Sequence, residues 1–357
     1  MPIPRLIHLL SSNAPDAKGR QTLDILKWFR DKGWSVCVYT RDARAVDSHF
    51  RKAGIPRRHL GMMGLSDIYS IRALTSDLRG EHPGTVMHAH RIKDAILALT
   101  ARFFARRSDI KVVLTVHNSR FSRPPAILKR VLRALDAVIF TTTEVAENFS
   151  RIFPVGEGKG MIIHYTVPSP SFLPLPEPGA GPMTAMWHGR MVPGKGLETL
   201  IDALPALKGK RIRLRIAGYG NPDYVDSLRR RATALGVMPM IDWTSAAENI
   251  YSQIATAHFG VFPSTDPEAF GFPNIEYMAA GRTQIVTRGK LQQEYLTDGR
   301  DSVMTAPGDT DALSDAILSL ASDTERRIAL GASARRRYLA DMSWERFTQT
   351  LEEIYTS

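Results

Sequence analysis

Short apolar runs alternate with amphipathic helical segments along both halves of the chain, and this alternation predicts parallel β-sheets covered by helices. In the first half, the apolar runs predict strands at 5–10, 35–40, 84–88, 111–116, 136–141 and 160–164. In the second half, they predict strands at 184–188, 211–217, 238–242, 258–262 and 283–287. The fold class expected from this pattern is α/β, with two doubly wound parallel-sheet domains.

The two halves are separated by residues 165–182, which contain six prolines and two glycines. No helix or central strand tolerates that density of proline, so this stretch is predicted to be a linker. We place an N-terminal domain at 1–168, a C-terminal domain at 169–342 and a final helix at 343–357. Ligands of doubly wound sheets bind at the carboxyl ends of the strands, so site residues are expected in the loops that follow them.

The composition is that of a globular protein, because the chain has 357 residues of which 43% are hydrophobic. Its single cysteine, Cys37, lies in the apolar run "SVCVYT" and is expected to be a buried strand residue. One thiol forms neither an internal disulfide nor a cysteine zinc site. No run approaches about 18 uninterrupted apolar residues, so no transmembrane helix is expected.

The basic charge is confined to the first half of the chain. Residues 1–172 carry 27 Lys and Arg against 14 Asp and Glu, a net charge of +13, whereas residues 173–357 carry a net charge of −2. This excess favours an acidic partner such as an anionic membrane surface or a polyprenyl diphosphate. Segments 97–111 and 120–135 mix apolar periodicity with Arg and Lys, as interfacial helices do, although surface helices with one face in the core have the same pattern.

A nucleic-acid partner is not expected despite the isoelectric point near 9.8. The chain has no zinc-finger spacing, no aromatic-rich strand of the kind that stacks RNA bases and no arginine-rich tail.

Two carboxylates stand on either side of a glycine-containing turn in "PSTDPEAFGFPNIEYMAAG", residues 263–281. Glu268 is predicted to lie in the loop and Glu276 in the first turn of a helix that begins at Pro273 and ends at a left-handed Gly281. A carboxylate accepts hydrogen bonds from two adjacent hydroxyls, each contributing about 1.5–3 kcal/mol. The alternative interpretation is a helix-capping acid and a solvated loop acid.

The start of the same helix is predicted to attract phosphate through the free amides of Phe272, Asn274 and Ile275. A second phosphate-binding candidate is the loop "GRMVPGKG", which contains Arg190 and Lys195 but lacks the Walker spacing. Arginine binds phosphate in a bidentate manner and lysine supplies a compact charge, whereas a merely solvated basic loop is the alternative. Amides and cations for phosphate, together with carboxylates for hydroxyls, suit a phosphorylated sugar.

These segments together resemble the retaining glycosyltransferases of family 4, the group 1 glycosyl transferases. The resemblance rests on residues 263–281, on "WHGRMVPGKGLETLIDAL", "RIAGYG", "MHAHRIKDAILAL" and "VLTVHNS", and it extends from about residue 4 to residue 356. It implies the GT-B fold, in which two Rossmann-like domains face each other across a cleft. The N-terminal domain would bind the acceptor, the C-terminal domain would bind the nucleotide sugar, and the final helix would pack back onto the N-terminal domain.

The resemblance also implies roles for individual residues. The catalytic group would contain His117, Glu268, Arg190 and Lys195. The donor-binding group would contain Gly19, Gly218, Gly271, Phe272, Pro273, Asn274, Ile275 and Glu276. The chain departs from the family pattern at Lys18, Ala269 and Gln284, where small residues, glycine and proline are usual.

No metal and no cofactor are expected, because the two cations can neutralise a diphosphate leaving group. The pair His88 and His90 resembles a ligand pair, but no third ligand appears at a matching spacing.

The expected function is retaining transfer of a sugar from a nucleotide diphosphate donor, with a UDP-sugar favoured and GDP-mannose as the alternative. The expected partners are this donor, a glycan or polyprenyl-diphosphate-linked acceptor and an anionic membrane surface, at the cytoplasmic face of the plasma membrane. Two other classes remain open, namely a nucleotide-sugar-binding protein without catalysis and a basic membrane-interaction protein.

Overall fold

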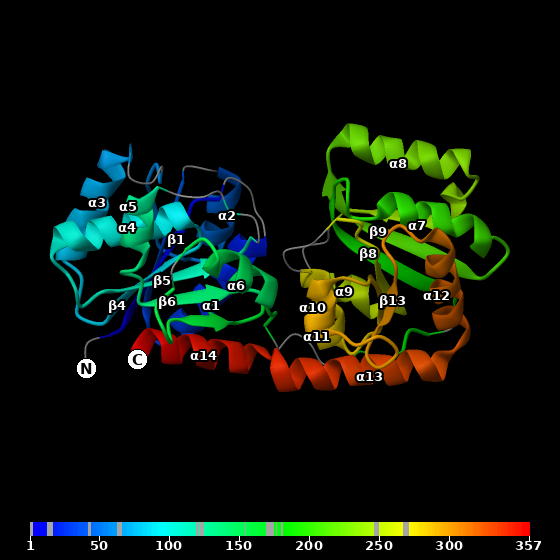
Figure 1. The fold of residues 1–357 in the computed structure, drawn as a ribbon. Coiled ribbons are helices and arrows are strands. Elements are labelled where there is room, and N and C mark those ends of the chain that lie inside the picture. The colour runs from blue at the N-terminus through cyan, green and yellow to red at the C-terminus, as the bar shows by residue number, and fades with distance from the viewer. Residues whose placement is uncertain are drawn as a thin grey trace. The chain divides into compact units, whose positions relative to one another are not determined.

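The computed structural model describes residues 3–12, 17–41, 44–62, 66–118, 121, 125–153, 155–168, 175, 177–179, 181–245, 250–266 and 271–357. The chain divides into two compact units (Figure 1). The N-terminal unit contains Met1–Tyr165 and Glu345–Ser357, and the C-terminal unit contains Thr166–Trp344. Two parallel-sheet α/β units are the fold class that the hydrophobic pattern predicts.

The N-terminal unit is built on a seven-stranded sheet in the order β3-β2-β1-β4-β5-β6-β7, with every pair parallel. Its strands are β1 (Arg5–Leu10), β2 (Ser35–Thr40), β3 (Arg57–His59), β4 (Thr85–Ala89), β5 (Lys111–Val116), β6 (Ala137–Phe140) and β7 (Gly160–Ile162). Its helices are α1 (Ala17–Asp31), α2 (Arg44–Lys52), α3 (Ile68–Arg79), α4 (Ile92–Ala105), α5 (Ala126–Leu132), α6 (Thr143–Ser150) and, from Glu345 on, α14 (Trp344–Thr356).

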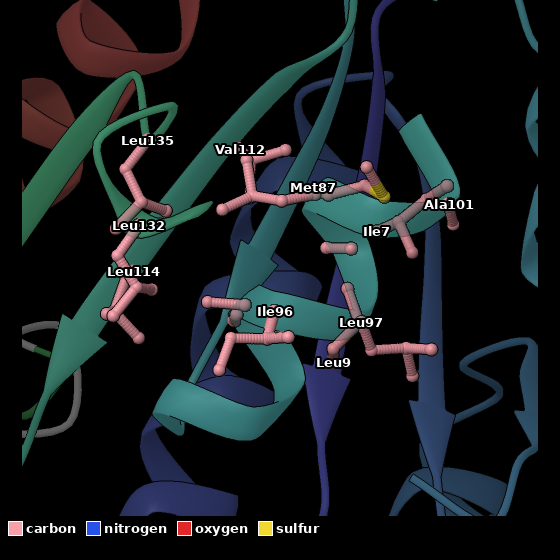
Figure 2. Close-up of a cluster of buried hydrophobic side chains, with 14 of the residues drawn as sticks. Ile7, Leu9, Met87, Ile96, Leu97, Ala101, Val112, Leu114, Leu132 and Leu135 are labelled. Atoms are coloured by element: carbon pink, nitrogen blue, oxygen red, sulfur yellow. The ribbon is translucent and has the colours of Figure 1, made fainter. Parts of the chain in front are cut away.

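One face of this sheet forms the main core of the N-terminal unit. Figure 2 shows Ile96 and Leu97 of α4 packed over Ile7 and Leu9 of β1, with Met87 of β4 beside them. Each such side chain contributes roughly 1.5–3 kcal/mol when it is removed from water. Leu97, Leu99 and Ala101 of segment 97–111 are buried in this core, so one face of the segment serves the fold.

Successive strand residues point to opposite faces, so the opposite face of the sheet carries the histidines His8 and His88 beside apolar residues such as Leu6 and Val113. His8 lies between Ile7 and Leu9 on β1 and pairs in register with His88 of β4. The parallel register thus places two histidines side by side on the face away from α4. Tyr355 of α14 covers this face, because its hydroxyl lies 2.6 Å from His88 Nδ1.

The C-terminal unit is built on a six-stranded sheet in the order β10-β9-β8-β11-β12-β13, also parallel throughout. Its strands are β8 (Met183–Met191), β9 (Ile212–Gly220), β10 (Ile241–Thr244), β11 (Phe259–Phe262), β12 (Gln284–Thr287) and β13 (Val303–Thr305). Its helices are α7 (Leu197–Ala203), α8 (Pro222–Ala234), α9 (Ile250–Ala255), α10 (Phe272–Ala280), α11 (Lys290–Tyr295), α12 (Thr310–Ser322) and α13 (Thr324–Asp341). Helices α7, α8 and α12 pack together, as do α9, α10 and α13 (Figure 1).

Each sheet has one point at which the strand order reverses, between β1 and β4 in the N-terminal unit and between β8 and β11 in the C-terminal unit. Ligands of open α/β sheets bind outside the carboxyl ends of the strands at such a point. The strand order therefore predicts binding sites at the loops that follow β1, β4, β8 and β11.

Most predicted strands correspond to observed ones, and the differences have physical reasons. The prediction for 238–242 is largely wrong, because Met238–Met240 form a 3-10 helix and β10 begins only at Ile241. Pro239 lies inside that stretch and has no N–H to donate to a sheet. The strands β3 and β13 were not predicted, since both are three-residue strands at sheet edges.

Two further expectations concern burial and membranes. Cys37 is buried in β2, as predicted, and burial raises the pKa of its thiol to about 11. Within the described part of the chain, no helix is both long enough and apolar enough to cross a bilayer.

Candidate functional site

The loop that follows β8 is locked against the segment that follows β11. Gly194 and Gly196 have φ angles of +83° and +73°, a region that glycine adopts without strain. A Cβ atom on Gly196 would lie 1.8 Å from the carbonyl oxygen of Pro263, and the Thr265 amide donates to the Gly194 carbonyl at 2.9 Å. The backbone around Lys195 is therefore fixed beside the switch point of the C-terminal sheet.

This arrangement places the two predicted phosphate-binding cations at one edge of one sheet. Arg190 is exposed near the end of β8, and Lys195 is half-buried in the glycine loop directly after it. Two cations at the carboxyl ends of parallel strands stabilise an anion that binds there.

Helix α10 begins at the same edge, and its C-terminus was predicted correctly. Gly281 has φ +69° and takes the left-handed cap position. The start of the helix differs from the prediction by one residue, since α10 begins at Phe272 and Pro273 is its second residue. Glu276 consequently lies in the second turn, and the prediction that places it in the first turn is wrong.

The amides at the helix start are also not all free. The Asn274 amide donates to the Gly271 carbonyl at 3.0 Å, which corrects the expectation of a free amide there. The Asn274 side chain donates to the Tyr295 hydroxyl at 2.9 Å, and the backbone carbonyl of Asn274 accepts from the Gln284 side chain at 3.0 Å. Asn274 therefore ties α10 to its neighbours. A direct role of Gly271, Phe272, Pro273 and Ile275 in donor binding stays a prediction.

Glu276 is paired with a histidine that the sequence interpretation missed. Its Oε2 accepts a hydrogen bond from His188 Nε2 at 2.6 Å, and the two residues are only 1% and 7% exposed. His188 stacks on Tyr277 with ring centroids 5.8 Å apart and meets Phe262 edge to face. The carboxylate of Glu276 is thus held in one orientation by a buried imidazole from the end of β8.

Of the remaining site residues, Gly218 has a packing role, and Glu268 is not described by the structure. Gly218 pairs with Gly189 across β8 and β9, and a Cβ on Gly218 would lie 2.1 Å from the Gly189 carbonyl oxygen. Close approach of the two strands therefore requires glycine at this position, whatever ligand binds. Glu268 lies outside the described residues, and so does Ala269.

In the N-terminal unit, Gly19 lies in the first turn of α1, the helix that follows β1. Thr22 on the next turn has its hydroxyl 3.1 Å from His90 Nε2. His117 directly follows β5 and is buried. The structure thus brings Gly19 and His117 to the carboxyl edge of the N-terminal sheet, where the strand order predicts a site.

Four buried histidines form what we call the histidine cluster, consisting of His8, His88, His90 and His117. His8 Nδ1 lies 2.8 Å from His90 Nε2, and His90 Nδ1 lies 3.1 Å from His117 Nε2. The Nδ1 atom of His117 is hydrogen-bonded to the hydroxyl of Tyr165. His88 is bound separately, because its Nδ1 meets Tyr355 and its Nε2 lies 2.6 Å from the Thr115 hydroxyl.

Burial keeps the histidine cluster uncharged. Desolvation lowers the pKa of each of the four imidazoles well below the ordinary value. The neighbouring cations act in the same direction, since Lys18 lowers the pKa of His90 and His117, and Arg91 lowers that of His117. The histidine cluster is therefore a set of neutral imidazoles at neutral pH.

The histidine cluster also bears on the question of a metal. His8 supplies the third histidine that the sequence spacing did not reveal, and ligand atoms of His8, His88 and His90 lie within 4.8 Å of one another. However, both nitrogens of His88 already have hydrogen-bond partners, and His8 Nδ1 and His90 Nε2 are hydrogen-bonded to each other at 2.8 Å. This geometry fits hydrogen bonding among the side chains better than shared ligation of one ion.

A buried carboxylate completes this edge of the N-terminal sheet. Asp94 of α4 accepts hydrogen bonds from the Ser11 amide at 3.2 Å and from the Ser11 hydroxyl at 2.9 Å. Burial raises the pKa of Asp94 to about 6, and the bonds from Ser11 oppose this rise. Asp94 thus holds the loop after β1 against the start of α4, a link between residues that are 83 positions apart.

Both halves of the chain match family profiles of known proteins. Residues 18–166 match the family profile described as "Glycosyl transferase 4-like domain", and residues 182–323 match the one described as "Glycosyl transferases group 1". A GDP-mannose-dependent alpha-(1-6)-phosphatidylinositol monomannoside mannosyltransferase of Mycolicibacterium smegmatis is 26% identical over 285 residues, covering 73% of this chain and 74% of its own. A glycogen synthase of Mycobacterium tuberculosis is 24% identical, covering 76% of this chain and 68% of its own.

Solved structures agree on the fold. HepE of Anabaena, in complex with UDP and glucose, superposes with a TM-score of 0.81 at 18% identity, covering 99% of both chains. A glycosyltransferase of Rickettsia africae superposes with a TM-score of 0.85 at 17% identity, covering 99% of this chain and 98% of its own.

Proposed function

Because this chain belongs to the group 1 glycosyltransferases of the GT-B fold and is therefore a glycosyltransferase that uses a nucleotide sugar, we propose that it transfers a hexosyl group with retention to an acceptor hydroxyl. The observation that carries this proposal is the switch point of the C-terminal sheet. Arg190 lies near the end of β8 and Lys195 in the loop after it, and the start of α10 and the Glu276–His188 pair belong to the same edge of this sheet. Cations suit a diphosphate and an oriented carboxylate suits sugar hydroxyls.

In the proposed reaction, the bond between the anomeric carbon and the diphosphate oxygen breaks as positive charge develops on the sugar ring. Arg190 and Lys195 stabilise the negative charge that accumulates on the departing diphosphate, the same electrostatic role that oxyanion donors have in other enzymes. Two protein cations supply this stabilisation without a metal ion. The acceptor hydroxyl attacks from the face that the diphosphate leaves, and the departing phosphate oxygen accepts its proton.

Glu276 binds the ribose hydroxyls of the nucleotide in this proposal, and His188 holds the carboxylate in place. A carboxylate has two acceptor oxygens with about four lone-pair sites, so the single hydrogen bond from His188 at 2.6 Å does not by itself fill its acceptor capacity. Glu268 has its proposed role at the sugar hydroxyls, and His117 has its proposed role beside the transferred sugar, both from the family resemblance alone.

The donor is proposed to carry either guanine or uracil. The mannosyltransferase relatives are named for GDP-mannose, which makes it the first donor to examine, and a UDP-hexose, favoured by the sequence resemblance, is the second. Thermal shift against GDP, UDP, ADP and their sugar conjugates distinguishes these, and product formation is followed by mass spectrometry. A chain that binds none of these nucleotides would contradict the proposal.

Lys195→Ala tests the chemical role of the glycine loop, with Lys210→Ala as the matched control. Lys210 is an exposed lysine just before β9, at the opposite edge of the same sheet. Lys195→Ala should reduce turnover by about a hundredfold, because removal of one donor to a developing oxyanion typically has that effect. Equal turnover in the two variants would contradict the role of Lys195, and loss of folding in Lys195→Ala alone would assign it to structure.

We also propose that the N-terminal unit contacts an anionic membrane that carries a lipid-linked acceptor, at the cytoplasmic face of the plasma membrane. Phe103 and Phe104 at the end of α4 are 76% and 56% exposed, and Arg106 follows them. Arg107 does not belong to this surface, because its guanidinium is bound to Asp109 and to two carbonyl groups. Exposed aromatic rings beside a cation are typical of interfacial segments.

A further inference from the structure

Three of the four histidines, His8, His90 and His117, are joined with Tyr165 by consecutive hydrogen bonds, which we call the hydrogen-bond chain. The chain consists of His8 Nδ1 to His90 Nε2, His90 Nδ1 to His117 Nε2, and His117 Nδ1 to the Tyr165 hydroxyl. Its members are buried and stacked, with ring centroids 5.0 Å, 5.3 Å and 5.5 Å apart along the chain. Each imidazole inside the chain uses both of its nitrogens.

A neutral imidazole has one N–H and one acceptor nitrogen, so a chain of neutral imidazoles in which every link is a hydrogen bond permits only two proton arrangements. The Thr22 hydroxyl, 3.1 Å from His90 Nε2, is compatible with both, because a hydroxyl donates to a lone pair and accepts from an N–H. In the first, every proton points toward Tyr165, and His117 carries its proton on Nδ1. In the second, every proton points toward His8, and His117 carries its proton on Nε2. The tautomer of His117 is therefore fixed by the direction of the whole chain rather than by its nearest neighbour alone.

The His8 end decides between the two arrangements. His8 Nε2 is buried and has no hydrogen-bond partner among the residues that the structure describes. In the first arrangement this atom is a lone pair, and in the second it is an N–H donor. Orphaned buried N–H groups are rarer than under-satisfied acceptors, so the first arrangement is favoured.

We propose that His8, His90 and Tyr165 are positioning residues that hold His117 as the neutral Nδ1–H tautomer. His117 then donates from Nδ1 to the Tyr165 oxygen and accepts at Nε2 from His90. Since both ring nitrogens are occupied, the side chain presents a fixed, uncharged ring and does not exchange a proton during transfer. The catalytic part of this inference rests on the proposed function, in which His117 lies beside the transferred sugar.

Nitrogen-15 NMR of histidine-labelled protein tests the tautomer directly, because the two ring nitrogens of a neutral imidazole have distinct shifts when protonated and unprotonated. The wild-type protein at neutral pH should show His117 with Nδ1 protonated. A spectrum in which His117 is protonated on Nε2, or on both nitrogens, would overturn the proposal whatever the activity of the enzyme.

Two phenol deletions form a matched pair. Tyr165→Phe removes the oxygen bonded to His117 Nδ1, and Tyr355→Phe removes the equally buried oxygen bonded to His88 Nδ1, outside the chain. Tyr165→Phe should change the His117 tautomer signal and lower kcat roughly tenfold, with donor affinity unchanged. Tyr355→Phe should leave the His117 signal as in the wild type. Identical His117 signals in both variants would overturn the proposal.

The His8 end of the hydrogen-bond chain provides a rescue test. In a Thr22→Val background, which removes the hydroxyl 3.1 Å from His90 Nε2, His8→Leu removes the remaining donor to that nitrogen, whereas His8→Asn keeps an N–H donor at the position of Nδ1. The leucine variant should lose the wild-type His117 signal, and the asparagine variant should retain it together with most of the kcat. Should the leucine variant not fold, the wild-type spectrum and the phenol pair decide the question.

Two further outcomes separate this inference from its alternatives. Addition of zinc to the wild-type protein should leave the resonances of His8, His88 and His90 unchanged, and their coordinated shift would assign the cluster to metal binding and overturn the proposal. Absence of sugar transfer by a wild-type protein that shows the Nδ1–H tautomer would reject the proposed function and the catalytic part of this inference, while the proton arrangement would stand.

Discussion

Gly196→Ala should reduce sugar transfer about a hundredfold, because it displaces the loop that carries Lys195. Gly196 has φ +73°, and a Cβ atom there would lie 1.8 Å from the Pro263 carbonyl oxygen, whereas Cβ atoms essentially never approach a heavy atom within 3.0 Å. One of the two backbone segments must therefore move by at least about 1.2 Å, the difference between these distances. The adjacent Lys195 moves with the loop, and a misplacement of about 1 Å in a catalytic site lowers the rate roughly a hundredfold.

Gly209→Ala is the control for the backbone conformation. Gly209 has φ +78°, and nothing lies within 4 Å of the Cβ that alanine would add. Both variants should lose about 1–2 kcal/mol of stability, because alanine is disfavoured in the left-handed backbone conformation. Only Gly196→Ala adds steric displacement, which lowers the stability by about 1–3 kcal/mol more. Urea unfolding gives the stabilities, and product formation from the identified donor gives kcat/KM.

The reasoning would be refuted by a Gly196→Ala protein that transfers sugar as fast as Gly209→Ala does. Such a result would mean that the contact between the two loops does not position Lys195. Reduced stability with unchanged transfer would lead to the same conclusion, because the strain would then be absorbed away from the site.

Three further predictions concern binding, membranes and pH. Glu276→Ala should weaken the binding of free nucleotide and of the donor alike, by about ten- to hundredfold, which is the equivalent of one charge-assisted hydrogen bond. Unchanged nucleotide affinity in calorimetry would contradict the ribose role of Glu276. Replacing Phe103 and Phe104 with serine should reduce sedimentation with anionic vesicles, while Tyr69→Ser, at an exposed aromatic residue in α3, should not; equal binding by all variants would place the membrane face elsewhere. The N-terminal unit should lose stability on acidification below about pH 6.5, because the folded histidine cluster binds fewer protons than the unfolded chain does. Each histidine then lowers the free energy of unfolding by up to about 1.4 kcal/mol per pH unit. Asp94, whose pKa is raised to about 6, binds more protons when folded and offsets the destabilising effect of about one histidine below that pH. A melting temperature that is flat or rises as the pH falls from 7 to about 5 would contradict the neutral histidine cluster.

The sequence was most informative where local chemistry decides the structure. Strands buried on both faces read as continuous apolar runs, which is why β1, β2 and β5 were predicted with their observed bounds. Gly281 was predicted as a left-handed cap because few residues other than glycine take that conformation. The edge strand β3 has the sequence "RRH", and no apolar pattern indicates it.

The parts that escaped prediction depend on pairing between distant segments. His188 and Glu276 are 88 positions apart, and His8 and His90 are 82 apart. Nothing in the spacing of a single segment reveals which residues share a register across parallel strands. His188 had one usable signal, its place directly before Gly189 at the end of a predicted strand, where site residues concentrate.

The return of α14 to the N-terminal unit makes that unit discontinuous along the chain. Tyr355 binds His88, its ring packs against Phe29, and Lys32 pairs with Glu352 at 2.7 Å. During synthesis the ribosome must therefore produce the whole C-terminal unit before the N-terminal unit can acquire these contacts. A gene fragment encoding only residues 1–165 would yield a protein whose His88 and Phe29 face water, and coexpression with a 345–357 peptide is the way to restore them.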